Sequence, residues 1–184
     1  MISEDIETER LILAILAEDE VDDDYRRWMS DPEVVRYLET RGGSPTVAAL
    51  REYVASMRAS HDSYFFGMFL RDGRRHIGNI KLGPVSALHN RASIGLVIGD
   101  KATWGQGYAA EAVGAIAAWA FDVVGLDKLT AGSYARNLGS IRAFQRHGFR
   151  VEGVQRSQVR LDDGTRDDVV MLGRTRDDDD EPIR

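Results

Sequence analysis

The chain has 184 residues, of which 43% are hydrophobic and 29% are charged. This length suits one globular domain, and the composition argues against collagen-like, low-complexity and disordered classes. Acidic residues outnumber basic ones by 30 to 24, so the chain lacks the Lys and Arg excess with which proteins bind nucleic acid. It contains no Cys, which removes disulfides, thiolate zinc sites and a cysteine nucleophile.

The two ends of the chain are both acidic. The first ten residues, MISEDIETER, are acidic where a secretory signal is basic and then apolar, and no apolar run reaches the roughly 18 residues of a spanning helix. We therefore expect a cytoplasmic protein without a membrane partner. Because of the DDDDE run, we expect residues 1–175 to form one domain and residues 176–184 an acidic, disordered tail.

The N-terminal half predicts one strand followed by helices. Apolar residues favour a buried strand at 10–16, and Ser30-Asp31-Pro32 has the capping residues and early Pro that begin a helical turn. Val47, Leu50, Val54 and Met57 recur at helical spacing. The predicted elements are therefore a strand at 10–16, a polar helix at 22–28, a helical turn from 30 and a helix opened by Ser44-Pro45.

The rest of the chain predicts a mixed sheet. The expected elements are strands at 64–70, 76–82 and 91–98, a helix at 107–124 stopped by Gly125, a strand at 128–134, a helix from Asn137 to about 147 ended by Gly148, and a hairpin of 149–161 with 167–172. This order gives an α/β fold with mostly antiparallel N-terminal strands, a central right-handed β-α-β crossover and a C-terminal hairpin.

The segment Trp104-Gly105-Gln106-Gly107-Tyr108-Ala109-Ala110 lies between a strand and a long helix. Its two glycines free amide N–H groups at a helix N-terminus, which is a favourable site for a phosphate or pyrophosphate. A tight turn without a ligand is the alternative. The pattern also fits G-x-G-x-x-A, but residues 99–103 separate it from the strand, and Ser133-Tyr134-Ala135-Arg136 lacks the ribose-binding acid of a nicotinamide or flavin enzyme.

Several motifs in sequence order resemble the GNAT acyl-CoA N-acyltransferase superfamily. They are GLVIGD at 95–100, the glycine loop with Glu111, the pair Asn137 and Ser140, and the run from Phe144 to Gly148-Phe149. The segment WGQGYAAEA most resembles the sequences of the branch that contains ribosomal-protein N-terminal acetyltransferases and amino-sugar acetyltransferases. The resemblance implies a splayed strand pair, acetyl-CoA as co-substrate, no metal, and direct acetyl transfer to a primary amine.

The resemblance also implies the site residues. Those implied to contact coenzyme A are Val97, Ile98, Gly105, Gln106, Gly107, Tyr108, Ala109, Asn137, Ser140 and Phe144. Ser140 is implied as the catalytic partner of the departing thiolate, because the Tyr that many members place seven residues after the Asn is Phe144 here. Helix capping is the alternative for both Asn137 and Ser140.

The identity of the general base and the residues that line the acceptor side both have alternatives. The resemblance implies that relatives with a catalytic carboxylate place it where Val159 stands, which leaves Glu152, Asp168, His89 or a water as candidates. The resemblance places Tyr25, Trp28, Tyr37 and Leu38 on the acceptor side, although each is equally suited to the core.

Arg156, Gln158 and Arg160 alternate along a predicted strand, so period-two geometry puts them on one face. A basic wall there would suit a small, nucleotide-linked amino sugar better than a cationic protein N-terminus. The alternatives are a solvated strand face, an N-terminal acetyltransferase of a ribosomal or other protein, and a non-enzymatic module that senses coenzyme A. We expect a monomer or a homodimer.

Overall fold

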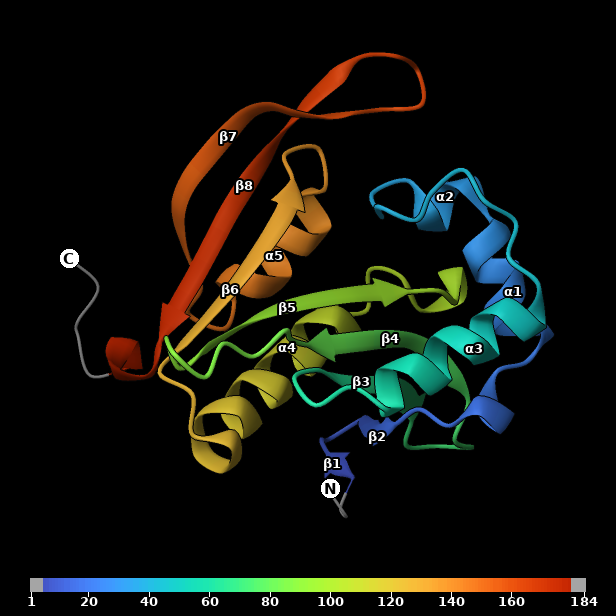
Figure 1. Cartoon of the computed structure of the whole chain (residues 1–184), viewed down its shortest axis with the longest axis horizontal. Helices are drawn as coiled ribbons and strands as arrows, with labels where there is room; N and C mark the ends of the chain where they lie inside the picture. The colour runs from blue at the N-terminus through green and yellow to red at the C-terminus, as the bar shows by residue number, and fades with distance from the viewer. Residues whose placement is uncertain (1–4, 180–184) are drawn as a thin grey trace.

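The computed structural model describes residues 5–179 as an eight-stranded mixed sheet with helices on both faces (Figure 1). The strand order is β1-β2-β3-β4-β5-β6-β8-β7, and only the β5–β6 pair is parallel. The strands are β1 (Ile6–Glu7), β2 (Leu11–Ile15), β3 (Tyr64–Leu70), β4 (His76–Leu82), β5 (Arg91–Ile98), β6 (Lys128–Tyr134), β7 (Arg150–Arg160) and β8 (Arg166–Thr175). The predicted α/β class, with antiparallel N-terminal strands and a C-terminal hairpin, is confirmed.

The α-helices are α1 (Asp23–Ser30), α2 (Pro32–Val35), α3 (Val47–Arg58), α4 (Tyr108–Trp119) and α5 (Leu138–Gln145). α3 begins later than Ser44-Pro45 predicted, because the Thr46 side chain accepts a hydrogen bond from the Ala49 amide and caps the helix. The helix predicted over 107–124 becomes π-helical at Ala120–Val124 and ends at Gly125, whose φ is +81°. Within residues 5–179, no helix has the length and apolarity to cross a bilayer.

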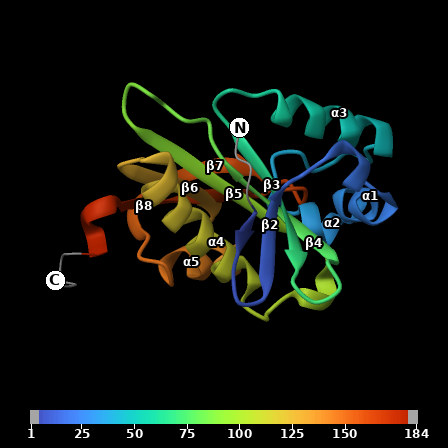
Figure 2. The same ribbon diagram turned by 90° about the horizontal axis from the view of Figure 1, so that it is seen from below.

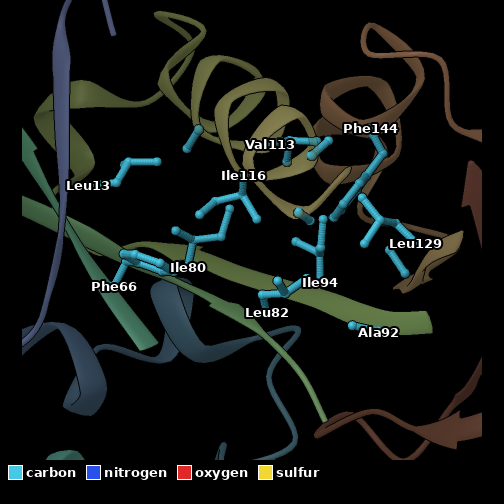
Figure 3. Packing of buried hydrophobic residues seen from close by; sticks show 14 of the residues in the cluster. Leu13, Phe66, Ile80, Leu82, Ala92, Ile94, Val113, Ile116, Leu129 and Phe144 are labelled. Carbon is cyan, nitrogen blue, oxygen red and sulfur yellow. The ribbon is translucent and has the colours of Figure 1, made fainter. Parts of the chain in front are cut away.

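Two apolar cores hold the helices to the sheet. Figure 2 shows α3 on one side of the strands and α4 with α5 on the other. On the α4 side, Val113 and Ile116 pack over Phe66, Ile80 and Ile94, all at most 3% exposed (Figure 3). Full burial of each large apolar side chain contributes about 1.5–3 kcal/mol.

The second core lies on the opposite face. Alternate residues of a strand point to opposite faces, so β2 places Leu13 under α4 while Ala14 packs with α1 and α3. Tyr25 of α1 and Val54 of α3 are at most 2% exposed in this core, which also contains Phe69. Tyr25 is therefore a core residue.

The segment predicted as a tail starts with an ordered turn. Arg176–Asp179 forms a 3-10 helix, in which Arg176 Nη2 donates to the Leu126 carbonyl at 2.8 Å and Asp178 accepts from the Thr175 amide at 2.7 Å. The expected boundary at residue 176 therefore needs correction for these four residues. Residues 180–184 lie outside the described part of the chain.

A histidine packs against the second core. The ring of His76 stacks on Phe69 with 4.8 Å between centroids, and its Nε2 lies 2.8 Å from the Gly78 carbonyl and 3.0 Å from Asn79 Oδ1. Burial lowers the pKa of His76, and this effect outweighs the hydrogen bonds to Asn79 and Gly78 that act to raise it. The folded protein therefore binds the His76 proton less readily than the unfolded chain does.

We expect this histidine to make stability fall as the pH drops below about 6.5, the pKa of an unfolded His. Above that pH both states are neutral and the contribution is fully present. As the pH falls toward the lower folded-state pKa, only the unfolded chain gains a proton and is favoured. Urea unfolding at about pH 7.5 and pH 5.5 should show a smaller loss of stability for His76→Gln than for the wild type.

The control is His89→Gln, which changes an exposed histidine of the β4–β5 loop. Its loss of stability over the same pH interval should match that of the wild type. An equal pH dependence in the wild type and His76→Gln would show that His76 does not contribute.

Candidate functional site

The parallel strands β5 and β6 separate after their first three paired residues. The two strands pair only at Arg91, Ala92 and Ser93, opposite Lys128, Leu129 and Thr130. Beyond Ser93, β5 continues to pair with β4 on one side, while β6 turns away with β8 (Figure 1). The splayed strand pair implied by the resemblance is present.

The backbone of β5 presents unpaired groups to this gap. The Ser93 carbonyl and the Gly99 amide both bond to the β4 segment, so odd-numbered residues face β4. The peptide groups of alternate residues face opposite sides of a strand, so those of Leu96 and Ile98 face the gap. The Ile98 carbonyl accepts a hydrogen bond from Trp104 Nε1 at 2.9 Å, which leaves the Ile98 N–H and both Leu96 groups open to a ligand.

A cavity of about 480 Å³ occupies the gap. Its lining comes from four segments: Glu33, Val34, Arg36, Tyr37 and Leu38 in and after α2; Leu96, Val97 and Ile98 of β5; Thr103, Trp104, Gly105, Gly107, Tyr108, Ala109 and Ala110 before and in α4; and Asn137, Gly139, Ser140, Arg142, Ala143 and Arg146 along α5. A second hollow of about 370 Å³ beside the β3–β4 turn shares no lining residue with it.

The glycine loop forms one end of the cavity. Gly105 has φ +74° and Gly107 has φ +87°, in the left-handed region that glycine adopts without strain. Gly107 is the N-cap of α4 and supplies no capping side chain, so the first N–H groups of the helix remain available. Such amides, together with the positive end of the helix dipole, are suited to bind an anion.

Eight of the ten residues implied to contact coenzyme A line the cavity, and two do not. Phe144 is 2% exposed and packs edge-on against Phe149, with 5.1 Å between the ring centroids. Its side chain points from α5 toward Leu129 of β6 (Figure 3). Its place as a cofactor contact is therefore wrong, because this side of α5 is covered by the core. Gln106 is also absent from the lining, since its side chain donates back to the Ala102 carbonyl at 2.7 Å.

Asn137 and Ser140 lie together at the start of α5. Asn137 Oδ1 accepts a hydrogen bond from the Ser140 amide at 3.2 Å, so Asn137 caps the helix. The Ser140 hydroxyl makes no hydrogen bond within residues 5–179, and the residue lines the cavity. Its side chain is therefore available to a ligand, while the capping contact uses only its backbone.

The three base candidates all lie outside the cavity lining. The Glu152 carboxylate pairs with Lys128, Asp168 accepts from the Ser157 amide at 2.7 Å, and His89 is exposed in the β4–β5 loop. Of the predicted alternatives, these positions leave a water as the base, or binding of an amine that is already neutral.

The alternation expected for Arg156, Gln158 and Arg160 is interrupted. Gln155 pairs with Val169 and Val159 with Asp167, so four steps on β7 oppose two on β8, and Ser157 has φ +50°. This bulge breaks the period-two geometry, and none of the three residues lines the cavity. The prediction of a basic wall on this strand is therefore wrong.

The site residues predicted from the sequence did not include the arginines that line the cavity. Arg142 and Arg146 lie one helical turn apart on α5, and Arg36 lies on the loop side of α2. None of the three has an ion-pair partner within the described residues. Arg142 and Arg146 could have been predicted from their positions one helical turn apart on the helix that Asn137 caps.

Among residues 5–179, Glu33 is the one acidic residue that lines the cavity. Glu33 lies 3.1 Å from Lys101 Nζ, which also pairs with Asp31 at 2.7 Å. The hydrogen bond between Lys101 and Asp31 is the main reason that the pKa of Asp31 is lowered and that of Lys101 raised. Because Arg36, Arg142 and Arg146 line the cavity with Glu33, the described wall carries a net positive charge.

The loop after α2 is fastened to the end of β6. The Tyr134 hydroxyl donates to Glu39 Oε1 and accepts from Arg41 Nη1, both at 2.6 Å, and the Tyr37 ring packs against Tyr134 at 5.8 Å. Burial and the bond to Glu39 raise the pKa of Tyr134. These contacts place Tyr37 and Leu38 on the cavity wall, whereas Trp28 lies beneath Gly99 in the second core.

Within residues 5–179, no three His, Asp or Glu side chains gather as metal ligands would. The cavity instead combines an open strand edge, a bare helix N-terminus and a hydroxyl. These features together suit a long ligand that has amide groups, a thiol end and phosphates.

Comparison with known proteins agrees with this geometry. The model of the acetyltransferase (GNAT) domain matches residues 10–150. The "Probable N-acetyltransferase YjcK" of Bacillus subtilis is 36% identical over 112 residues, which cover 60% of this chain and 61% of that relative. The "Uncharacterized N-acetyltransferase YoaA" of the same organism is 28% identical over 156 residues, which cover 84% and 87% of the two chains.

A solved structure shares the fold. The ribosomal L7/L12 alpha-N-protein acetyltransferase RimL, in complex with coenzyme A, superposes with a TM-score of 0.83 at 18% identity, and the match covers 94% of this chain and 98% of RimL. At this identity the likeness shows the fold alone. The family model covers most of the chain, including the glycine loop and α5. The chain therefore belongs to the GNAT acetyltransferase family.

Proposed function

We propose that this protein moves an acetyl group from acetyl-CoA directly to a primary amine, with both substrates bound in the cavity between β5 and β6. The observation that supports this most is the open edge of β5, which faces a bare helix N-terminus in one cavity of about 480 Å³. The chain has no Cys, so an acyl-cysteine intermediate is excluded.

The cofactor's chemistry matches the cavity along its length. The amides of the pantetheine arm would pair with the backbone groups of Leu96 as an added strand does. The pyrophosphate would lie on the amides at Gly105 and Gly107. Arg142 and Arg146 add two positive charges on α5 for the phosphates. The full set of proposed contacts is Leu96, Val97, Ile98, Gly105, Gly107, Tyr108, Ala109, Asn137, Ser140, Arg142 and Arg146.

The transfer step needs three groups around the thioester. The neutral amine nitrogen attacks the carbonyl carbon, and the Ile98 N–H stabilises the oxyanion that forms. The carbon–sulfur bond then breaks, and Ser140 Oγ donates its hydrogen to the departing sulfur while it relays the proton that the amine nitrogen loses. The products are the acetylated amine and the free thiol of coenzyme A.

For the acceptor, we propose a small primary amine with an anionic group, such as a nucleotide-linked amino sugar. The supporting observation is Arg36, which lies on the cavity wall beside Tyr37 without an ion-pair partner among the described residues. Among the described lining residues Glu33 is the one acid, against three arginines. A polyamine or a cationic protein N-terminus would meet like charge here.

The test is thiol release from acetyl-CoA with three kinds of acceptor. The panel contains nucleotide-linked amino sugars, spermidine, and peptides that copy ribosomal protein N-termini. We expect turnover with the first kind. Turnover of only spermidine or the peptides would overturn the proposed acceptor class. Coenzyme A binding without turnover of a broad panel of primary amines would instead indicate a non-enzymatic module that senses coenzyme A.

Substitution of Arg36 provides a second measurement. We expect Arg36→Glu to lower kcat/KM for the anionic amine about tenfold or more, because attraction becomes repulsion, while KM for acetyl-CoA changes little. The matched control is Arg156→Glu, the same charge change at an exposed β7 position that does not line the cavity. Equal effects of the two variants would assign the result to overall charge.

A further inference from the structure

A single arginine joins the β1–β2 turn to the loop that precedes α4. Arg10 Nε and Nη2 contact Glu111 Oε2 at 2.7 and 2.6 Å, and Arg10 Nη1 donates to the Gln106 carbonyl at 3.0 Å. The guanidinium also lies 4.4 Å from the centre of the Tyr108 ring. Arg10 therefore contacts three residues of the loop and first turn that border the cavity.

Hydrogen bonds also hold the backbone of Arg10 in place. The Arg10 amide donates to Glu111 Oε1 at 2.8 Å, and its carbonyl accepts from the Arg71 amide at 2.8 Å. Thr8 Oγ1 adds a third contact to Glu111 Oε1, at 2.6 Å. Burial acts to raise the pKa of Glu111, but the bonds from Thr8 and Arg10 outweigh it and lower that pKa. The carboxylate is thus held in its charged form.

The bond to Gln106 fixes the orientation of a peptide group. In a planar trans peptide, the carbonyl oxygen and the next N–H point in opposite directions. Because the Gln106 carbonyl points at Arg10, the Gly107 N–H points away from Arg10, and Gly107 lines the cavity. Two left-handed glycines make this loop conformationally permissive, so an external contact is needed to select one orientation.

Arg10 also offsets a charge next to the anion site. Glu111 lies in the first turn of α4 and its side chain is 15% exposed. Its negative charge interacts favourably with the helix dipole but would repel a pyrophosphate on the same turn. The paired guanidinium cancels that repulsion.

We propose that Arg10 is a positioning residue, which orients the Gly105–Gly107 loop and neutralises Glu111 so that the α4 N-terminus receives the pyrophosphate of coenzyme A. This inference rests on the proposed function. Arg10 acts through Gln106 and Glu111 and has no role in the chemical step.

The test compares two ligands on two variants. Coenzyme A has the pyrophosphate and pantetheine lacks it, so only coenzyme A reports on the loop. Arg10→Ala removes the side-chain contacts to Glu111, Gln106 and Tyr108. Arg10→Lys keeps a charge for Glu111 but loses the planar group that reaches Glu111 and Gln106 together. The matched control is Arg71→Lys, since Arg71 bonds to Thr8 and Glu7 of the same turn and does not touch the loop.

We expect Arg10→Ala and Arg10→Lys to raise the Kd of coenzyme A about tenfold, measured by calorimetry, while the Kd of pantetheine changes less than about twofold. Arg71→Lys should alter neither. Equal weakening of both ligands, or unchanged affinity for coenzyme A, would overturn the role of Arg10. If Arg10→Ala does not fold, Arg10→Lys decides alone. Absence of coenzyme A binding in the folded wild type would instead overturn the proposed function.

Discussion

Substitution of Gly107 by Asp should weaken coenzyme A binding about a hundredfold. A carboxylate at the N-cap of α4 would lie where the pyrophosphate is proposed to bind, and two charges about 4 Å apart near a protein surface repel by up to about 4 kcal/mol. A hundredfold change in Kd corresponds to about 2.7 kcal/mol, within that range. A Cβ at Gly107 would lie 3.6 Å from Arg10 Nη2, an ordinary van der Waals contact, so the cost of the substitution in the free protein comes from the positive φ.

The control for this prediction is Gly107→Asn, which has the same size without the charge. The φ of +87° strains both variants, although Asn and Asp tolerate the left-handed region better than other residues. Both should lose about 1 kcal/mol in the free energy of unfolding. Calorimetry should then show a much smaller loss of affinity for Asn than for Asp; equal losses would mean that backbone strain, and not charge, controls the site.

Substitution of Ser140 by Ala should lower kcat about a hundredfold, with a much smaller change in KM for acetyl-CoA. Loss of a group that transfers a proton in the transition state typically costs at least this much. The hydroxyl has no other partner within residues 5–179, and the helix cap uses the Ser140 amide, which Ala retains. Thermal unfolding should therefore be nearly unchanged.

Two variants separate catalysis from capping. Ser140→Thr keeps a hydroxyl and should retain more activity than Ser140→Ala. Asn137→Ala removes the cap and should lower the free energy of unfolding by about 1 kcal/mol. If Ser140→Ala turns over as fast as the wild type, the serine is only a helix residue and the proton moves by another route.

The sequence alone determined the elements whose signals are local. Four strands, β3 to β6, have their predicted bounds, because each is an apolar or alternating run that ends at turn residues. The same holds for the Asn137 cap and the left-handed Gly125 and Gly148, which depend on residues a few positions apart. The glycine loop and the start of α4 after Gly107 also depend on neighbouring residues, so their geometry was predictable, while anion binding there stays a prediction.

Only the tertiary structure decided which side chains face the cavity. Ser140 and Phe144 lie one turn apart on α5, yet the first lines the cavity while the second is buried against Phe149, because the core covers that part of the helix. The bulge at Ser157 overrode strand alternation on β7. Arg10 and Gln106 are 96 positions apart, and only the packing of β2 against α4 brings them together. Such long-range contacts leave no periodic trace in the sequence, and at this site they determine the shape and charge of the cavity.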